Sequence, residues 1–313
     1  MILEADKKDS VLKRIGGIVL TTLFYAFLLT LLSLPGKREV ANPLSFGLVI
    51  SLIWVYYLYQ SIRHPEKKQV RDITIGVFVF FILWELTTKT FNTLIQVLYP
   101  APEDVFNIFI SDYPLMIRGI FSSLRLLFLG IGIALVSGNL LGLFVGWNNR
   151  LRRDFFPIAK VISPIPAMIY TPYLVAIMPS FSSASVAVVA LGLFWPTFMG
   201  MISNVGAIDR RIIDSARVMA VSTPTMLLRV ILPYLIPGIV RNLRIQLSVM
   251  FMILMMAEMI GAQSGLGFYI KKYSDYADYT HTVAGIILVG VVITILNSLL
   301  SLVEEKTIKW RTV

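Results

Sequence analysis

The chain has 313 residues, of which 57% are hydrophobic and 15% are charged, and its formal net charge is +10 at pH 7. Soluble domains carry about a quarter of charged residues, so this composition excludes a soluble protein and indicates one that crosses a membrane several times. Most lysines and arginines fall between apolar runs, a pattern that indicates orientation in a membrane and argues against a nucleic-acid partner.

An apolar run begins near residue 16, after a basic N-terminal segment. Because no Ala-x-Ala-like cleavage site follows, the run predicts an uncleaved first transmembrane helix rather than a removed signal peptide. A helix needs about 20 apolar residues to cross the hydrocarbon core. The chain therefore predicts an all-α fold with eight spans, near residues 16–34, 44–62, 73–98, 116–147, 157–178, 184–206, 234–260 and 283–303.

Lysine and arginine are distributed unevenly between alternate connections. Eighteen lie before the first span, after the last span and in the connections 63–71, 150–153 and 209–232, whereas the opposite side carries only four: Lys37, Arg38, Lys271 and Lys272. By the positive-inside rule, this asymmetry places both termini and the loop 209–233 in the cytoplasm.

The chain divides into two parts of unequal character. Residues 73–313 form a predicted six-span core that contains every motif, whereas residues 1–72 add two transmembrane helices and a basic loop. The N-terminal pair is therefore interpreted as an accessory, and nothing in its sequence indicates a role.

Several residues inside or near the spans are candidates for a pathway or gate. Pro164 and Pro166 free backbone groups, which suits a gate or cavity wall, or simply a kinked packing helix. Phe194 and Trp195, next to a proline expected to interrupt their span, are candidates for lining a cavity. Glu258, near a Gly-Leu-Gly turn, either pairs structurally at an outer gate or lines the pathway.

Three further patterns have simpler interpretations. Glu85 and Lys89 are four residues apart and predict a mutual ion pair on one helix. Glycines at 138, 142 and 146 predict close approach of another helix. The polar segment 271–279 predicts either a contact for an extracellular protein or a solvated loop.

The loop 209–233 is a basic interruption between two apolar runs, and it contains the segment Asp214-Ser215-Ala216-Arg217. Small side chains would let one face of a helix enter a pocket on another subunit, and an arginine can hold the loop or a partner by charged hydrogen bonds. A basic loop helix without a partner is the alternative interpretation.

Two later positions shape this loop. Alanine at position 220 resists the left-handed turn that glycine permits, so the sequence leaves the bend of the loop in doubt. Pro233 cannot continue the hydrogen-bond ladder, and we expect it to break the helix between the loop and the next span.

The loop resembles the docking loop of ABC importer permeases, in which Glu-Ala-Ala, three residues, Gly, nine residues and Ile-x-Leu-Pro follow one another. Asp214, Ser215 and Ala216 occupy the first three places, Ala220 replaces the glycine and Pro233 closes the pattern. About three quarters of the chain resembles the permeases for nitrate, sulfonate and taurine in particular. The other marks, in order, are Trp84-Glu-Leu86, Pro100-Ala-Pro102, Ser123-Leu-Arg125, Gly138 to Gly146, Arg150-Leu-Arg-Arg153, Pro164-Ile-Pro166, Leu243-Arg244 and Ala257 to Gly267.

This resemblance implies a type I importer core and a permease subunit that is not itself an enzyme. It implies a second permease copy or paralogue, two cytoplasmic ATPase subunits that bind ATP and Mg²⁺, and an extracellular binding protein that delivers a small polar solute. The expected location is the plasma membrane of a bacterium or archaeon. The chain has no phosphate-binding Gly-x-x-x-x-Gly-Lys-Ser/Thr loop, so we expect no cofactor in this subunit.

Two other classes of function predict different features. A secondary transporter or channel driven by an ion gradient predicts functional charges deep in several spans, of which the chain has few. An intramembrane enzyme needs clustered nucleophiles, bases or metal ligands; the chain has no cysteine, and both histidines lie in predicted loops on opposite sides, so neither a catalytic residue nor a metal site is predicted.

Overall fold

A computed structural model describes residues 2–64 and 68–307, with side chains for 15–64 and 68–304. Every regular element in these residues is a helix, which confirms the all-α prediction. Packing divides the chain into two compact parts: residues 1–114 with 273–284, and residues 115–272 with 285–313. The division at residue 72 into accessory and core stays a prediction, and Lys67, Lys309 and Arg311 of the predicted charge asymmetry lie outside the described residues.

Within the described residues, six helices are long and apolar enough to cross a membrane, or seven spans if one bent helix pair counts as a span. The predicted count of eight is therefore not confirmed. Two predicted spans account for the difference. Residues 157–178 fall in the bent pair Asn149–Ile162 and Ala167–Ile177, and residues 73–98 fall in the 18-residue helix Lys68–Glu85, which carries four charged side chains, and a π-helical turn that ends at Thr90. The six are Ile15–Ser33, Leu44–Arg63, Tyr113–Trp147, Phe181–Gly206, Thr223–Gly261 and Tyr279–Glu304.

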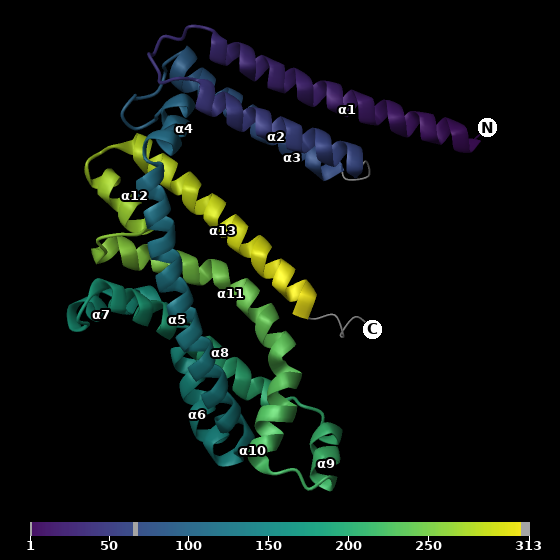
Figure 1. Ribbon diagram of the computed structural model, residues 1–313, viewed down its shortest axis with the longest axis vertical. Helices are drawn as coiled ribbons and strands as arrows, with labels where there is room; N and C mark the ends of the chain where they lie inside the picture. The colour runs from purple at the N-terminus through teal and green to yellow at the C-terminus, as the bar shows by residue number, and fades with distance from the viewer. Residues whose placement is uncertain (1, 65–67, 308–313) are drawn as a thin grey trace. The chain divides into compact units, whose positions relative to one another are not determined.

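The first part is built from helices of the N-terminal third of the chain (Figure 1). They are α1 (Ile2–Ser33), α2 (Leu44–Arg63), α3 (Lys68–Glu85), a π-helical turn η1 (Leu86–Thr90) and α4 (Pro102–Ser111). Pro102 lies in the first turn of α4, where its missing N–H would have no partner in any case. Helix α3 packs against both α1 and α2, and α2 also packs against α4.

A buried lysine connects α1 to α3 and α4. Lys89 Nζ lies 3.1 Å from Glu85 Oε1 and 2.8 Å from Glu103 Oε1, and it donates to the carbonyl oxygen of Leu32 in the last turn of α1 at 3.0 Å. The two carboxylate side chains are fully buried. The predicted Glu85–Lys89 pair is thus confirmed, and it extends to Glu103 and to the end of α1.

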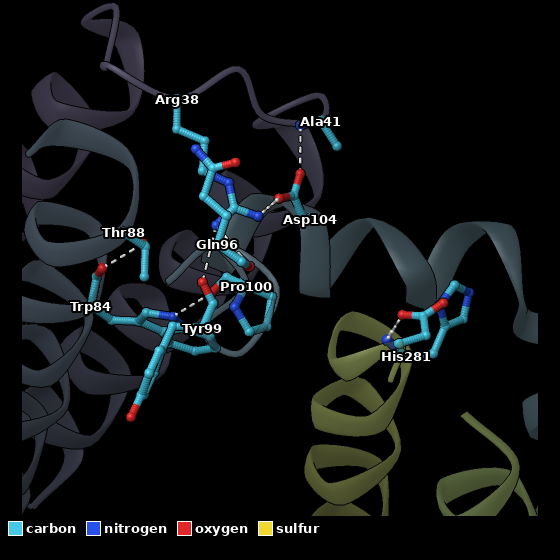
Figure 2. Close-up of polar contacts among 10 residues, drawn as sticks. Arg38, Ala41, Trp84, Thr88, Gln96, Tyr99, Pro100, Asp104 and His281 are labelled. Atoms are coloured by element: carbon cyan, nitrogen blue, oxygen red, sulfur yellow. Dashed lines mark hydrogen bonds and ion pairs between the residues drawn. The ribbon is translucent and has the colours of Figure 1, made fainter. Parts of the chain in front are cut away.

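The loop between α1 and α2 is held by an arginine (Figure 2). The Arg38 guanidinium donates to Asp104 Oδ2 at 3.2 Å and to the carbonyl oxygen of Tyr99 at 3.0 Å, while Asp104 Oδ1 accepts from the backbone N–H of Ala41 at 2.8 Å. The N-terminal helix pair is therefore joined to α4 and the preceding loop by polar contacts as well as by helix packing.

The polar segment at residues 271–279 is ordered by side-chain contacts. Tyr273 donates a hydrogen bond to Asp112 Oδ2 at 3.1 Å and stacks on His281 with ring centroids 4.2 Å apart. His281 Nδ1 lies 2.7 Å from Asp278 Oδ2. Burial, followed by the charge of Asp112, raises the pKa of Tyr273 to about 12. Tyr273 and Asp278 are therefore held in a polar cluster, whereas Asp275, Tyr276 and Ala277 are exposed, and both interpretations of the segment stay predictions.

The second part contains most of the remaining helices (Figure 1). In chain order the elements after α4 are α5 (Tyr113–Trp147), α6 (Asn149–Ile162), the 3-10 turn η2 (Ala167–Tyr170), α7 (Thr171–Ile177), α8 (Phe181–Gly206), α9 (Arg210–Val218), α10 (Thr223–Thr225), the π-helix η3 (Met226–Ile231), α11 (Leu232–Gly261), α12 (Leu266–Asp275) and α13 (Tyr279–Thr307). Helix α8 packs on α6, α7 and α11, so it is central to this part.

The spaced glycines of α5 face α8. A Cβ atom on Gly142 would lie 2.7 Å from Met201 Cβ, and one on Gly146 would lie 3.0 Å from Val205 Cβ. Gly138 faces Thr197 in the same way, at 3.2 Å. The interpretation of these glycines as a helix-packing surface is confirmed, because no larger residue fits without displacing α8.

Two proline segments behave differently. The break at residues 163–166 separates α6 from the η2–α7 pair, and the two helical pieces are bent by 80°. By contrast, Pro196 does not interrupt α8, which runs from Phe181 to Gly206, so the expected interruption was wrong. A proline inside a helix removes a single backbone hydrogen bond, and the packing of α8 against three other helices is sufficient to keep it helical.

Candidate functional site

The loop after α8 is a folded unit that packs on its inner side against the transmembrane helices. Asp209 caps α9, since its Oδ1 accepts from the N–H of Arg211 at 2.9 Å. Ala216 is 8% exposed and belongs to a buried apolar cluster with residues of α5, α8 and η3, among them Met201 and Met226. Helix α9 therefore rests on a cluster formed by several helices.

The outer side of α9 is exposed and charged. Asp214 and Arg217 form a loose ion pair, with 3.7 Å between Oδ1 and Nη1 and side chains each 65% exposed. An exposed pair of this kind contributes little to stability. The Ser215 hydroxyl donates to the carbonyl oxygen of Arg211 at 2.7 Å, so this side chain lies against the helix and does not protrude from its surface.

The end of α9 turns through a left-handed residue. Ala220 has φ 54°, its N–H donates to the carbonyl oxygen of Arg217 at 2.9 Å, and the N–H of Val221 donates to that of Ala216 at 3.3 Å. These two bonds form a Schellman motif, which usually has glycine at the left-handed position. The bend that the sequence left in doubt is therefore present, and alanine adopts it.

The turn exposes two apolar side chains that sequence reasoning did not select. Val218 is 88% exposed and Met219 is 77% exposed, beside the charged side chains of α9. The sequence could have indicated them by their position, because both lie between the buried Ala216 and the turn at Ala220. An apolar pair on a polar, protruding helix is typical of a protein contact surface.

Pro233 does not separate the loop from the next span. Residues 223–231 are already helical and lead into α11, with a π-helical stretch η3 before Pro233, so the expected break was wrong. A π-helical turn changes the hydrogen-bond register, which lets the helix accommodate the missing N–H of proline. Within the loop 209–233, the non-helical residues are Asp209, which caps α9, and residues 219–222.

Glu258 lies at the other end of α11 and is only 1% exposed. Its Oε1 accepts from the Ser123 hydroxyl at 2.7 Å, and its Oε2 accepts from the N–H of Gly267 at 2.8 Å. Ser123 Oγ in turn accepts from the N–H of Leu266 at 2.9 Å. This arrangement supports the structural interpretation of Glu258, which joins α5, α11 and the start of α12.

Of the other pathway candidates, the two prolines are exposed and the two aromatic residues pack against neighbouring helices. Pro164 and Pro166 are exposed at the bend after α6. Phe194 and Trp195 are half-buried and pack on a cluster of α5, α6 and α8, with Phe194 stacked on Phe198 at 5.5 Å between centroids. Their role in a pathway stays a prediction.

Two adjoining cavities open beside the N-terminal turns of α8. Their volumes are about 490 Å³ and 910 Å³, and they share Leu126, Met178, Ser182 and Ser264. Arg125 lines the larger cavity and Ser185 the smaller. Within the described part of the chain, no group of three His, Cys, Asp or Glu side chains could hold a metal ion.

Comparison with known proteins places most of these residues in one family. The profile of the family described as "Binding-protein-dependent transport system inner membrane component" matches residues 138–309, more than half of the chain. The putative aliphatic sulfonates transport permease protein SsuC of Bacillus subtilis is 27% identical over 183 residues, which are 58% of this chain and 65% of that protein. The taurine transport system permease protein TauC of Escherichia coli is 25% identical over 256 residues, covering 79% of this chain and 92% of its own.

A solved structure has a similar fold. A chain of the MetNI methionine ABC transporter, crystallised in inward-facing conformations, matches with a TM-score of 0.54 and 19% identity. The match covers 63% of this chain and 98% of that chain. At this identity the similarity concerns the fold alone, and it agrees with a type I importer-like core.

Proposed function

Because the chain belongs to the family of binding-protein-dependent transport system inner membrane components, we propose that it is the permease subunit of an ATP-driven importer. In this proposal two copies, or one copy and a paralogue, enclose the path of a small polar solute delivered by an extracellular binding protein. ATP and Mg²⁺ are bound by two cytoplasmic ATPase subunits. The permease is a multi-pass protein of the plasma membrane with both termini in the cytoplasm.

The single observation that carries the proposal is the two-sided packing of α9. Its inner side is fixed by Ala216 in a buried cluster, whereas its outer side presents Asp214, Arg217, Val218 and Met219 to solvent. A helix that served only to connect two spans would not need to be packed in a buried cluster on one side and to expose apolar side chains at its end. Both features are needed if α9 transmits the movement of an attached subunit to the membrane helices.

In this proposal, movement passes from α9 into the membrane along α11. The helix that begins at Thr223 continues through η3 into α11 up to Gly261, where Glu258 connects α11 to Ser123 and the start of α12. A displacement of α9 would therefore be carried along one nearly continuous helix to the opposite end of the second part. ATP binding would favour one conformation by its differential affinity for the closed ATPase dimer.

The test is co-purification and ATP hydrolysis with the ATPase subunit in lipid, for the unchanged permease and for Asp214→Lys and Arg217→Glu. Both side chains are largely exposed, so the variants should keep the thermal stability of the isolated permease and lose association or stimulated hydrolysis. Lys37→Glu, an exposed charge reversal in the first part, is the control. Unchanged association and hydrolysis in both variants would remove the docking argument and favour a carrier driven by an ion gradient.

A further inference from the structure

A further cavity, of about 340 Å³, lies between α6 and the last turns of α8. Its lining includes Arg152, Arg153 and Phe156 of α6 and Ile202, Ser203 and Gly206 of α8. The volume is within the range of small-molecule sites. Two cationic side chains therefore border an opening whose remaining lining is mostly apolar.

The Arg152 guanidinium lies against the end of α8, where Gly206 has no side chain. A Cβ atom on Gly206 would lie 2.8 Å from Arg152 Nη1. Arg152 is half-buried and Arg153 is exposed, and neither forms a hydrogen bond or an ion pair with any described residue. The N–H donors of both guanidiniums are therefore available to a ligand.

The two arginines do not stabilise α6 itself. They lie near its N-terminus, where the helix dipole favours negative charge. Asp154, the acidic residue of α6, is exposed and does not line the cavity, and Asp209 beyond α8 accepts from the N–H of Arg211 instead. The charge that borders the cavity is therefore positive, and it favours an anionic ligand.

The remainder of α6 has an apolar outer side. Phe155, Ile158 and Val161 follow one another at intervals of three residues and are 43%, 49% and 72% exposed. Val161 lies about 14 Å beyond Arg152 along the helix axis. Positive charge at one end of a helix, followed by an exposed apolar side, matches the headgroup and acyl regions of one membrane leaflet.

The cavity lies at the end of the second part that also carries α9 (Figure 1). Gly206 is the last residue of α8, and α9 begins four residues later at Arg210. In the orientation proposed above, this end is on the cytoplasmic side, where the surface of a membrane leaflet with anionic lipids attracts arginine and lysine.

We propose that Arg152 and Arg153 bind the headgroup phosphate of an anionic phospholipid, whose acyl chains lie along the outer side of α6. A guanidinium can donate to two phosphate oxygens at once, and Gly206 leaves the space that the Arg152 guanidinium occupies. A zwitterionic headgroup would bring an ammonium group towards the same positive charges, so an anionic lipid is favoured. The lipid site goes beyond the proposed function and shares with it only the cytoplasmic orientation of this end.

The test is a titration of the full-length permease in neutral detergent with dioleoyl phosphatidylglycerol. Dioleoyl phosphatidylcholine has the same chains without the net charge, and glycerol phosphate has the charge without the chains. Native mass spectrometry would count the bound lipids, and the rise in melting temperature would give the affinity. Phosphatidylglycerol should bind at one site per chain, and the other two compounds should bind at least about tenfold more weakly.

The variants separate the site from general attraction of charge. Arg152→Gln combined with Arg153→Gln should weaken phosphatidylglycerol binding by about tenfold, whereas Arg150→Gln, at the same end of α6 but outside the cavity lining, should change it by less than about twofold. Gly206→Ala should weaken binding without changing the charge, because its methyl group displaces the Arg152 guanidinium. If the paired variant unfolds, Arg153→Gln alone, at an exposed position, should show part of the loss.

Four results would overturn the lipid site. Equal binding of both lipids would remove the role of charge, and an equal loss in Arg150→Gln and the paired variant would leave only general attraction to basic residues. Binding of glycerol phosphate as tight as that of the lipid would assign the arginines to a soluble phosphate. Lipid that binds the permease alone but not its complex with the ATPase would assign this surface to an acidic region of that subunit. None of these measurements uses ATP hydrolysis, so failure of the lipid site is distinct from failure of the proposed function.

Discussion

Ser123 Oγ lies 2.7 Å from Glu258 Oε1 and 2.9 Å from the backbone nitrogen of Leu266, so a single hydroxyl group connects three segments that are far apart in sequence. The hydroxyl donates to the carboxylate of α11 and accepts from the first turn of α12, while its own residue belongs to α5. Since both Ser123 and Glu258 are buried, water cannot replace either bond. The stability of this end of the second part therefore depends on the carboxylate.

Replacing Glu258 by alanine should lower the melting temperature of the detergent-solubilised permease by several degrees. The change leaves the Ser123 hydroxyl and the Gly267 N–H without an acceptor, and each buried unsatisfied group costs about 1–3 kcal/mol. Glu258→Gln keeps the shape and one acceptor oxygen and should lose less. Equal melting temperatures for the alanine variant and the unchanged protein would show that the network is not needed for stability.

Gly267→Ala should destabilise the same region without removing any polar group. A Cβ atom at this position would lie 2.5 Å from the carbonyl oxygen of Met255 and 2.8 Å from Glu258 Cβ, so α11 and α12 would have to separate. Gly238→Ala, another helical glycine, in α11, is the matched control, since no atom lies within 4 Å of the added methyl group. Fluorescence-detected size exclusion after heating would compare the two, and similar curves would contradict the packing argument.

The sequence predicts local features of the fold well, because periodicity and charge spacing are local. The limits of α5, α8 and α11 follow from their apolar runs, and the pairing of Glu85 with Lys89 follows from a spacing of four residues. Prolines also predicted the break after α6, although not the angle of 80°. The eight-span count is not confirmed, because α3 carries four charged residues and the segment from α6 to α7 is bent.

Contacts that depend on the folding back of loops could not be predicted. Glu103 joins Lys89 only because α4 returns to α3, and Ser123 contacts Glu258 across a sequence separation of 135, which no local spacing encodes. The same reason applies to Ser182 and Arg125, which meet at one cavity from different helices. Pro196 and Pro233 were expected to break helices, whereas packing against three other helices keeps α8 helical at Pro196 and the π-helical stretch η3 accommodates Pro233.

Lys89→Met should strongly destabilise the N-terminal part. The change keeps the apolar stem but leaves two buried carboxylates without their cation, and the loss of one member of a buried ion pair typically costs about 3–5 kcal/mol. Lys37→Met, at an exposed lysine of the adjoining loop, should have little effect. Expression level and melting temperature in detergent would provide the comparison.

A second substitution separates charge from shape at this site. If the cost of Lys89→Met comes from uncompensated negative charge, adding Glu85→Gln should recover part of the lost stability, because it removes one of the two carboxylates. An additive loss in the double variant would instead assign the effect to packing or to the hydrogen bond with Leu32.

Ala220→Gly should stabilise the loop that carries α9. Alanine in the left-handed region pays a steric penalty of roughly 1–2 kcal/mol that glycine does not, and here the two hydrogen bonds of the Schellman motif hold it there. The glycine variant should therefore be cleaved more slowly by trypsin at Arg217, whereas Ala220→Val, with a β-branched side chain in the same conformation, should be cleaved faster. A faster cleavage of the glycine variant would mean that the flexibility gained by the unfolded loop outweighs the relief of strain. The proposed contact with the ATPase gives an independent check, because a better-formed α9 should bind that subunit at least as tightly as the unchanged loop.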